Sequence, residues 1–326
     1  MISPAVLERP GHWRTIGVVV GIAIVSSPTL PLLALAFDGL SGFDIGTGFD
    51  AYLARSLKVG IGASALALVL GFPCGLLAGL YRFPARNALL ALLALPLLVP
   101  SFLWAIGLSM LRIELGLPQE SWLSGAPGTV MAFGALGTGL VVFATLLAAR
   151  AFPARAIDAA RLAGGELNVV RYAGRAALPA GVAACLLVGL ISFADPGPGQ
   201  ILGYSGAGTQ ILVSFSALFD FELAARQSLT IASIVLLGAI PLLWILGRNL
   251  SFALLPQSVE SMRARSVASV NVAGPLLLGL VLIVTLALPV AGLVGPAFTQ
   301  LWLDRIAEVA ARTAGNTFWI FREKCG

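Results

Sequence analysis

The chain has 326 residues, of which 58% are hydrophobic and only 11% are charged. A soluble chain carries about 25% charged residues and cannot bury so much apolar surface, so a soluble globular protein is excluded and an all-α integral membrane protein is expected. The net charge of +5 comes from Lys and Arg residues spread over short loops, without the basic run interleaved with aromatics that is typical of nucleic-acid binding.

Seven segments are predicted to cross the membrane, because a spanning helix needs about 20 mainly apolar residues. The first is too long for the apolar region of a secretory signal and no small-residue cleavage site follows it, so we expect it to be retained. Prolines and glycines inside the spans are tolerated, since neighbouring helices re-satisfy the freed backbone groups. In chain order the predicted spans are Thr15–Phe37, Ser56–Tyr81, Ala88–Leu111, Gly128–Ala149, Pro179–Ala194, Ser228–Gly247 and Ala273–Phe298.

The basic residues predict the orientation of these spans. With the N-terminus in the cytoplasm, the inner loops hold twelve Lys and Arg residues, and the outer loops before residue 300 hold four. Basic residues concentrate in cytoplasmic loops, so we expect a multi-pass protein of a bacterial inner membrane with its N-terminus inside. We divide the chain into residues 1–50 (first span and outer loop), 51–250 (five spans and the longest inner loop) and 251–326 (linker, seventh span and tail).

The inner loop over residues 151–179 has the pattern of a helical elbow. Asp158 and Arg161 lie three residues apart and therefore on one helical face. The pair Gly164–Gly165 predicts a break, after which a second short helix is expected. Pro179 is expected to open the fifth span. The sequence therefore predicts a helix-turn-helix that is charged on one side and projects from the cytoplasmic face.

At this loop the chain resembles the permeases of binding-protein-dependent ATP-binding-cassette (ABC) importers. Their cytoplasmic loop reads Glu-Ala-Ala, three residues, Gly, nine residues, a hydrophobic residue, any residue and Leu-Pro. This sequence has Asp158-Ala159-Ala160, then Gly164 after three residues, and later Leu178-Pro179. Asp in place of Glu keeps the charge. The gap before Leu178-Pro179 is two residues longer than in the common pattern.

A second stretch, after the loop, is similar to the permeases of ferric-iron, thiamine, polyamine and aminophosphonate importers. The resemblance as a whole covers roughly residues 50–250. The second stretch consists of Phe193–Gly197, Ile201–Gly203, Thr209–Ile211 and Phe215–Phe221. The resemblance implies a type I ABC importer permease core, and ferric iron, a small cation or an organophosphorus compound as candidate solutes. It assigns coupling to an ATPase to the elbow, with Asp158 making a polar contact or cap and Gly164 forming the turn.

The partners implied by the resemblance are a cytoplasmic ABC ATPase, a periplasmic or lipid-anchored solute-binding protein, and a second permease copy or half. In this family two halves are often fused in one chain. The element Ala54-Arg55-Ser56 has a counterpart in Ala311–Thr317, so residues 251–326 are either the start of a second half or end in an ordinary amphipathic tail.

The sequence lacks the motifs of an enzyme. It has no GxxxxGK[ST] phosphate loop, no GxSxG and no HExxH, so ATP hydrolysis is expected in a separate chain and neither a cofactor nor a metal is expected here. A secondary transporter or channel remains the alternative, although such proteins more often carry charges within the spans or inverted repeats. Asp195, at the outer end of the fifth span, is either part of the solute pathway or a solvated loop residue.

Overall fold

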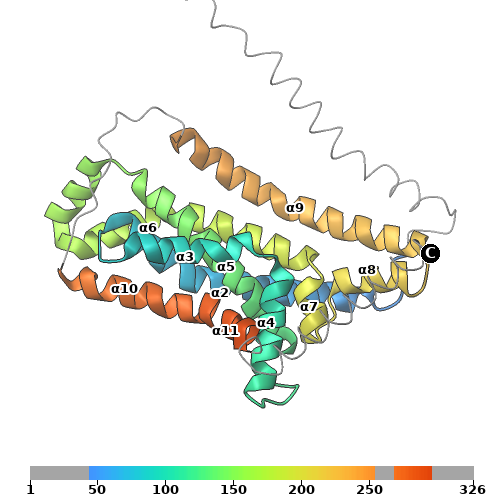
Figure 1. Ribbon diagram of the computed structural model, residues 1–326. Helices are drawn as coiled ribbons and strands as arrows, with labels where there is room; N and C mark the ends of the chain where they lie inside the picture. Colours follow the sequence, from blue (N-terminus) through green and yellow to red (C-terminus); the bar gives the residue numbers. More distant parts are fainter. Residues whose placement is uncertain (1–43, 254–267, 296–326) are drawn as a thin grey trace, which may run out of the picture.

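The computed structural model describes residues 44–253 and 268–295, which form one helical bundle (Figure 1). The helices follow one another with short connections, and their long apolar stretches lie side by side. In chain order they are α2 (Phe49–Leu80), α3 (Arg86–Leu98), α4 (Ser101–Glu114), α5 (Gly125–Arg150), α6 (Ala154–Ala194), α7 (Gly197–Leu202), α8 (Ala207–Ser216), α9 (Phe221–Ala253), α10 (Ala268–Leu282), the π-helical turn η2 (Ile283–Ala287) and α11 (Leu288–Val294).

Within the described residues, five helical stretches are long and apolar enough to cross a membrane, and a sixth crossing results if the bent pair α3–α4 counts as one span. This confirms a multi-pass, all-α membrane protein. The five stretches correspond to the predicted second, fourth, fifth, sixth and seventh spans, with ends that differ from the predicted ones, whereas the predicted first span lies outside the described residues. They are Phe49–Leu80, Gly125–Arg150, Arg155–Ala194, Phe221–Ile245 and Val270–Val294.

The predicted third span, Ala88–Leu111, is wrong as a continuous helix. It is broken into α3 and α4, whose axes meet at 101°. Pro100 is the cause, because a proline disfavours helical geometry in the residue before it. Val99 accordingly has φ −101° and ψ 133°, an extended conformation, and α4 begins directly after the proline.

The predicted opening of the fifth span at Pro179 is also wrong. Pro179 lies inside α6, and the helix that follows the glycine break continues through it to Ala194. A proline removes one backbone hydrogen bond from a helix, and a membrane helix tolerates this where neighbours pack closely around it. The second short helix of the elbow and the fifth span are therefore one helix.

The core of the bundle is the contact of α2 with α5 and α6. Three glycines spaced by four residues, Gly71, Gly75 and Gly79, form a stripe on α2 that faces α5. A Cβ at Gly71 would lie 2.8 Å from the carbonyl oxygen of Thr138, and one at Gly79 would lie 2.7 Å from Cβ of Ala149. Small residues let membrane helices approach this closely, and the backbones pack without intervening side chains.

The pairing of these helices fixes their directions. Residue numbers rise together along the α2–α5 contact, so the two helices are parallel. Across α2 and α6 they run in opposite senses, since Ser64 Oγ donates to the Cys185 carbonyl at 2.9 Å and Tyr81 Oη donates to Glu166 at 2.7 Å. This agrees with the predicted alternation of the spans. The turn after α2 and the start of α6 consequently lie at one end of the bundle (Figure 1).

Further helices cover this core from two sides. On one side α11 packs against α4, where the backbones of Gly107 and Gly292 touch. Residues 268–295 therefore belong to the same bundle as residues 51–250. On the other side α9 lies along α6, and the buried side chain of Gln227 joins α8 to the chain before α2, accepting from Ser214 Oγ at 3.0 Å and donating to the Ile45 carbonyl at 3.1 Å.

Candidate functional sites at the two ends of α6

The elbow predicted for residues 151–179 begins with a short helix, the first part of α6. Pro153 precedes it in an extended conformation, φ −61° and ψ 133°, and the helix runs to the glycine pair. Gly164 is extended, with φ −177°, whereas Gly165 has φ 70°, in the left-handed region that favours glycine. The break is therefore where it was predicted, but the residue that requires glycine is Gly165 rather than Gly164.

The predicted motif residues separate into two groups. Asp158, Ala159, Ala160 and Gly164 lie together in the short helix and at the break, and Asp158 pairs with Arg161 at 2.9 Å on one helical face as predicted. Leu178-Pro179 lies fourteen residues beyond Gly164 in the same helix, about 20 Å along its axis. The structure does not bring the two groups together.

A carboxylate that the sequence analysis did not single out organises the break. Glu166 Oε1 accepts a hydrogen bond from Arg161 Nε at 2.7 Å, and Glu166 Oε2 accepts one from Tyr81 Oη at 2.7 Å. Tyr81 is the residue directly after α2 and is 2% exposed. Burial raises the pKa of Tyr81 well above its ordinary range, and the hydrogen bond to Glu166 adds to the effect.

The two faces of the elbow differ. Its inner face packs Ile157, Val169 and Ala173, all buried, against the ends of α2 and α5. Its outer face carries the pair Asp158–Arg161, in which the side chain of Asp158 is 69% exposed and that of Arg161 is 22% exposed. Leu162, beside the break, is 92% exposed. Leu162 is thus an exposed apolar side chain next to an ion pair, at the end of the bundle rather than along its apolar flank.

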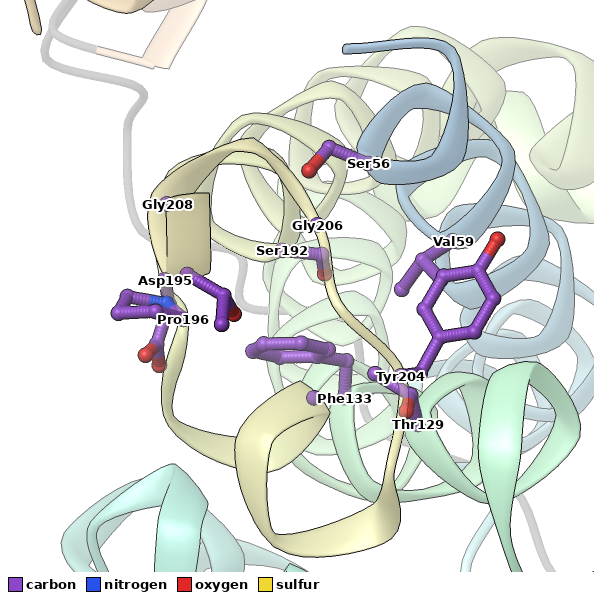
Figure 2. A pocket seen from close by; sticks show the side chains of 12 residues that line it. Ser56, Val59, Thr129, Phe133, Ser192, Asp195, Pro196, Tyr204, Gly206 and Gly208 are labelled. Atoms are coloured by element: carbon purple, nitrogen blue, oxygen red, sulfur yellow. The ribbon is translucent and has the colours of Figure 1, made fainter. Parts of the chain in front are cut away.

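At the other end of α6 the chain forms a small cleft, partly open to the outside, with about 20 Å³ accessible to the centres of water-sized molecules. The ends of α2, α5 and α6 contribute to it, together with α7, α8 and the loop between them (Figure 2). Small and hydroxyl-bearing side chains dominate its lining. The lining residues are Ser56, Val59, Thr129, Phe133, Ser192, Asp195, Pro196, Gly199, Tyr204, Gly206, Gly208 and Thr209.

Most hydroxyls of the cleft already have partners. Ser56 Oγ accepts from the backbone N–H of Ala207 at 2.9 Å, and Thr129 Oγ1 donates to the Gly125 carbonyl at 2.7 Å. Thr209 Oγ1 is buried without a partner among the described residues. A buried hydroxyl in this state is a place for an ordered water.

Asp195 lies on the cleft wall across from the Tyr204 ring (Figure 2). Its Oδ2 accepts from Ser101 Oγ at 2.5 Å and its Oδ1 accepts from the Gly197 N–H at 2.8 Å. Ser101 is the first residue of α4 and Gly197 the first of α7, so the carboxylate joins the end of α6 to the beginnings of two helices, where the helix dipole favours a negative charge. The structure thus gives Asp195 a structural contact at the wall of the cleft.

The sequence contained only weak signals for Tyr81, Glu166 and Ser101. Ser101 follows a proline, where a helix start is common, and Glu166 directly follows a glycine pair. Their partners are distant in sequence, 85 residues for the Tyr81–Glu166 pair and 94 for the Ser101–Asp195 pair. Within the described residues, no three His, Cys, Asp or Glu side chains are grouped as metal ligands would be.

Comparison with known proteins does not identify a family. No protein-family model matches the chain, and no curated protein is significantly similar to it.

Proposed function

We propose that the chain is the membrane-spanning permease subunit of an ABC importer and that the elbow couples it to a cytoplasmic ATPase. The observation that carries the proposal is the elbow itself: a short helix set off from the spanning part of α6 by the break at Gly164–Gly165, with Leu162 exposed on its outer face. Such a helix can seat in a groove of a partner, as amphipathic helices do, and pass the partner's movement into α6.

The distribution of charge supports the orientation that this function needs. Arg82, two residues after the end of α2, and Arg150, the last residue of α5, are both exposed and lie at the same end of the bundle as the elbow. Cytoplasmic loops are rich in arginine, so this end faces the cytoplasm, where ATP is available. The opposite end then faces the solute-binding protein, and the exposed side chain of Phe219, in the turn between α8 and α9, is available there for its docking.

The pathway itself requires a second permease copy or half, because one bundle supplies one wall of an alternating-access route. Ferric iron is the solute we propose, and it rests on the resemblance of residues 193–221 to permeases of that group. A secondary transporter or channel with this fold would take its driving force from an ion gradient and would leave the elbow without an ATPase to contact.

The test is reconstitution into liposomes with a cassette ATPase and a solute-binding protein from the same organism. We expect uptake of ferric iron that requires ATP and survives collapse of ion gradients by ionophores. Leu162→Asp should lower ATP-driven uptake at least about tenfold, the effect of losing roughly 1.4 kcal/mol or more at a partner's surface. Leu115→Asp, at a leucine 57% exposed at the opposite end, is the matched control and should leave the ATPase contact unchanged.

Uptake that follows an ion gradient and ignores ATP would contradict the proposal and favour the secondary transporter. Uptake of another solute with the same ATP dependence would support the permease function and contradict only the assignment of ferric iron as the solute.

A further inference from the structure

The carboxylate of Glu166 connects three segments of the chain at the base of the elbow. Glu166 lies at the start of the long part of α6. Its carboxylate accepts one hydrogen bond from Arg161, in the short helix before the break, and another from Tyr81, at the end of α2. Both hydrogen bonds are 2.7 Å long. Bonds from a guanidinium to a carboxylate are charge-assisted and about twice as strong as neutral ones.

The Arg161–Glu166 pair exists because of the glycine break. Residues five apart on a straight α-helix point about 140° away from each other and cannot pair. Gly165, with φ 70°, turns the chain so that the two side chains meet across the break. The ion pair therefore acts on the angle between the short helix and the rest of α6, which two glycines alone would leave weakly defined.

The bond to Tyr81 fixes this angle relative to α2. Tyr81 is buried, and α2 is held to α5 along the stripe Gly71, Gly75 and Gly79, so the tyrosine is attached to the most closely packed pair in the bundle. A displacement of the short helix is thus transmitted to α2 as well as along α6. Asp158, in contrast, pairs with the same arginine from within the short helix, and this contact does not cross the break.

We propose that Glu166 is a positioning residue that holds the elbow at a fixed angle to α2, so that the short helix and the α2–α5 pair move as one unit. The consequence for transport rests on the proposed function, because it assumes an ATPase that moves the elbow. The fixed angle between the elbow and α2 does not depend on the proposed function, and it can be tested on the full chain without an ATPase.

The test measures the distance between two spin labels by pulsed electron resonance, in lipid nanodiscs. One label replaces Ala163 in the short helix and the other replaces Ala88 in α3, both exposed, in a background without the native cysteines. We expect a single narrow distance distribution in the parent. Glu166→Gln removes the charge that holds Arg161, and Tyr81→Phe removes the contact with α2. Each should raise the share of displaced elbows at least about tenfold, given the strength of charge-assisted bonds.

The matched control is Asp158→Asn, which makes the same carboxylate-to-amide change on the same arginine without crossing the break. It should leave the distribution unchanged. Circular dichroism and gel filtration establish that each variant is folded, and Tyr81→Phe, which deletes one oxygen atom, keeps the test open if Glu166→Gln does not fold. Parent-like distributions in folded Tyr81→Phe and Glu166→Gln would overturn the proposal, as would equal broadening by Asp158→Asn. Neither result would bear on whether an ATPase binds the elbow.

Discussion

Replacing Gly75 by Ala adds one methyl group at the closest point of the α2–α5 contact. A Cβ there would overlap the carbonyl oxygen of Val142 and lie 2.8 Å from Cβ of Thr145, whereas carbons in contact are about 3.5–4.0 Å apart. The two helices must separate by about 1 Å at this turn. Overpacking of this kind costs about 1–3 kcal/mol, and alanine's better helix propensity offsets at most about 1 kcal/mol. We expect Gly75→Ala to lower the free energy of unfolding by about 1–2 kcal/mol.

The assay is heating of the detergent-solubilised protein with a maleimide dye that fluoresces when it reacts with a thiol. Cys74, next to the mutated residue, is fully buried and reacts only on unfolding, and Cys325 is replaced by Ser so that it gives no background. A loss of 1–2 kcal/mol corresponds to a fall in Tm of about 2–8 °C. The control is Gly279→Ala in α10, where a Cβ meets nothing within 4 Å. Equal Tm values for the Gly75→Ala and Gly279→Ala variants would refute the argument that α2 and α5 are held by backbone contact.

Three further predictions follow from buried polar contacts. Gln227→Leu leaves the buried hydroxyl of Ser214 without its partner and should cost about 1–3 kcal/mol, measured with the same dye. Ser101→Ala removes a donor from the carboxylate of Asp195 and should also cost about 1–3 kcal/mol, with Ser101→Thr restoring most of it, and a neutral result for Ser101→Ala would show that this contact does not hold α4. Burial raises the pKa of Tyr81, so the folded chain keeps the phenol proton at a pH where the unfolded chain releases it. The contribution of Tyr81 to stability is therefore full below about pH 10 and falls above it. Tyr81→Phe should make that fall shallower, as measured by thermal unfolding across about pH 8–11.5.

The spans that are long and uninterrupted could be predicted from composition alone. The predicted span Gly128–Ala149 differs from α5 by three residues at its start and one at its end. The number of consecutive apolar residues determines whether such a segment can cross the membrane, since the thickness of the hydrocarbon core sets how many residues must avoid water. The pair Asp158–Arg161 was predictable for a similar reason, because its geometry depends only on the helical repeat.

The bend between α3 and α4 could not be predicted with the same rule. Several spans contain prolines, and Pro73 and Pro241 lie within continuous helices. At Pro100 the helix breaks instead, and the redirected α4 packs on α11 where Gly107 meets Gly292, a contact between segments some 180 residues apart. Local sequence shows where a helix can break, and tertiary packing decides whether it does.

The contacts of Glu166 were missed for a related reason. A periodic pattern assigns a residue to a face of its own helix, and Glu166 acts across a break and toward another helix. The sequence indicated the break at the glycine pair, but the angle of the chain there depends on Gly165 and on a tyrosine from α2.

Contact between the elbow and a cytoplasmic ATPase can be detected by photo-cross-linking in intact cells of the native host. A benzoylphenylalanine at position 162 places the reactive group on the exposed outer face of the elbow, and one at position 122, where Trp122 is 53% exposed near the opposite end, is the control. We expect position 162 to cross-link to a protein that mass spectrometry identifies as an ABC ATPase, and we expect no such cross-link from position 122. Cross-links from position 162 to lipid or to this chain alone would contradict this expectation.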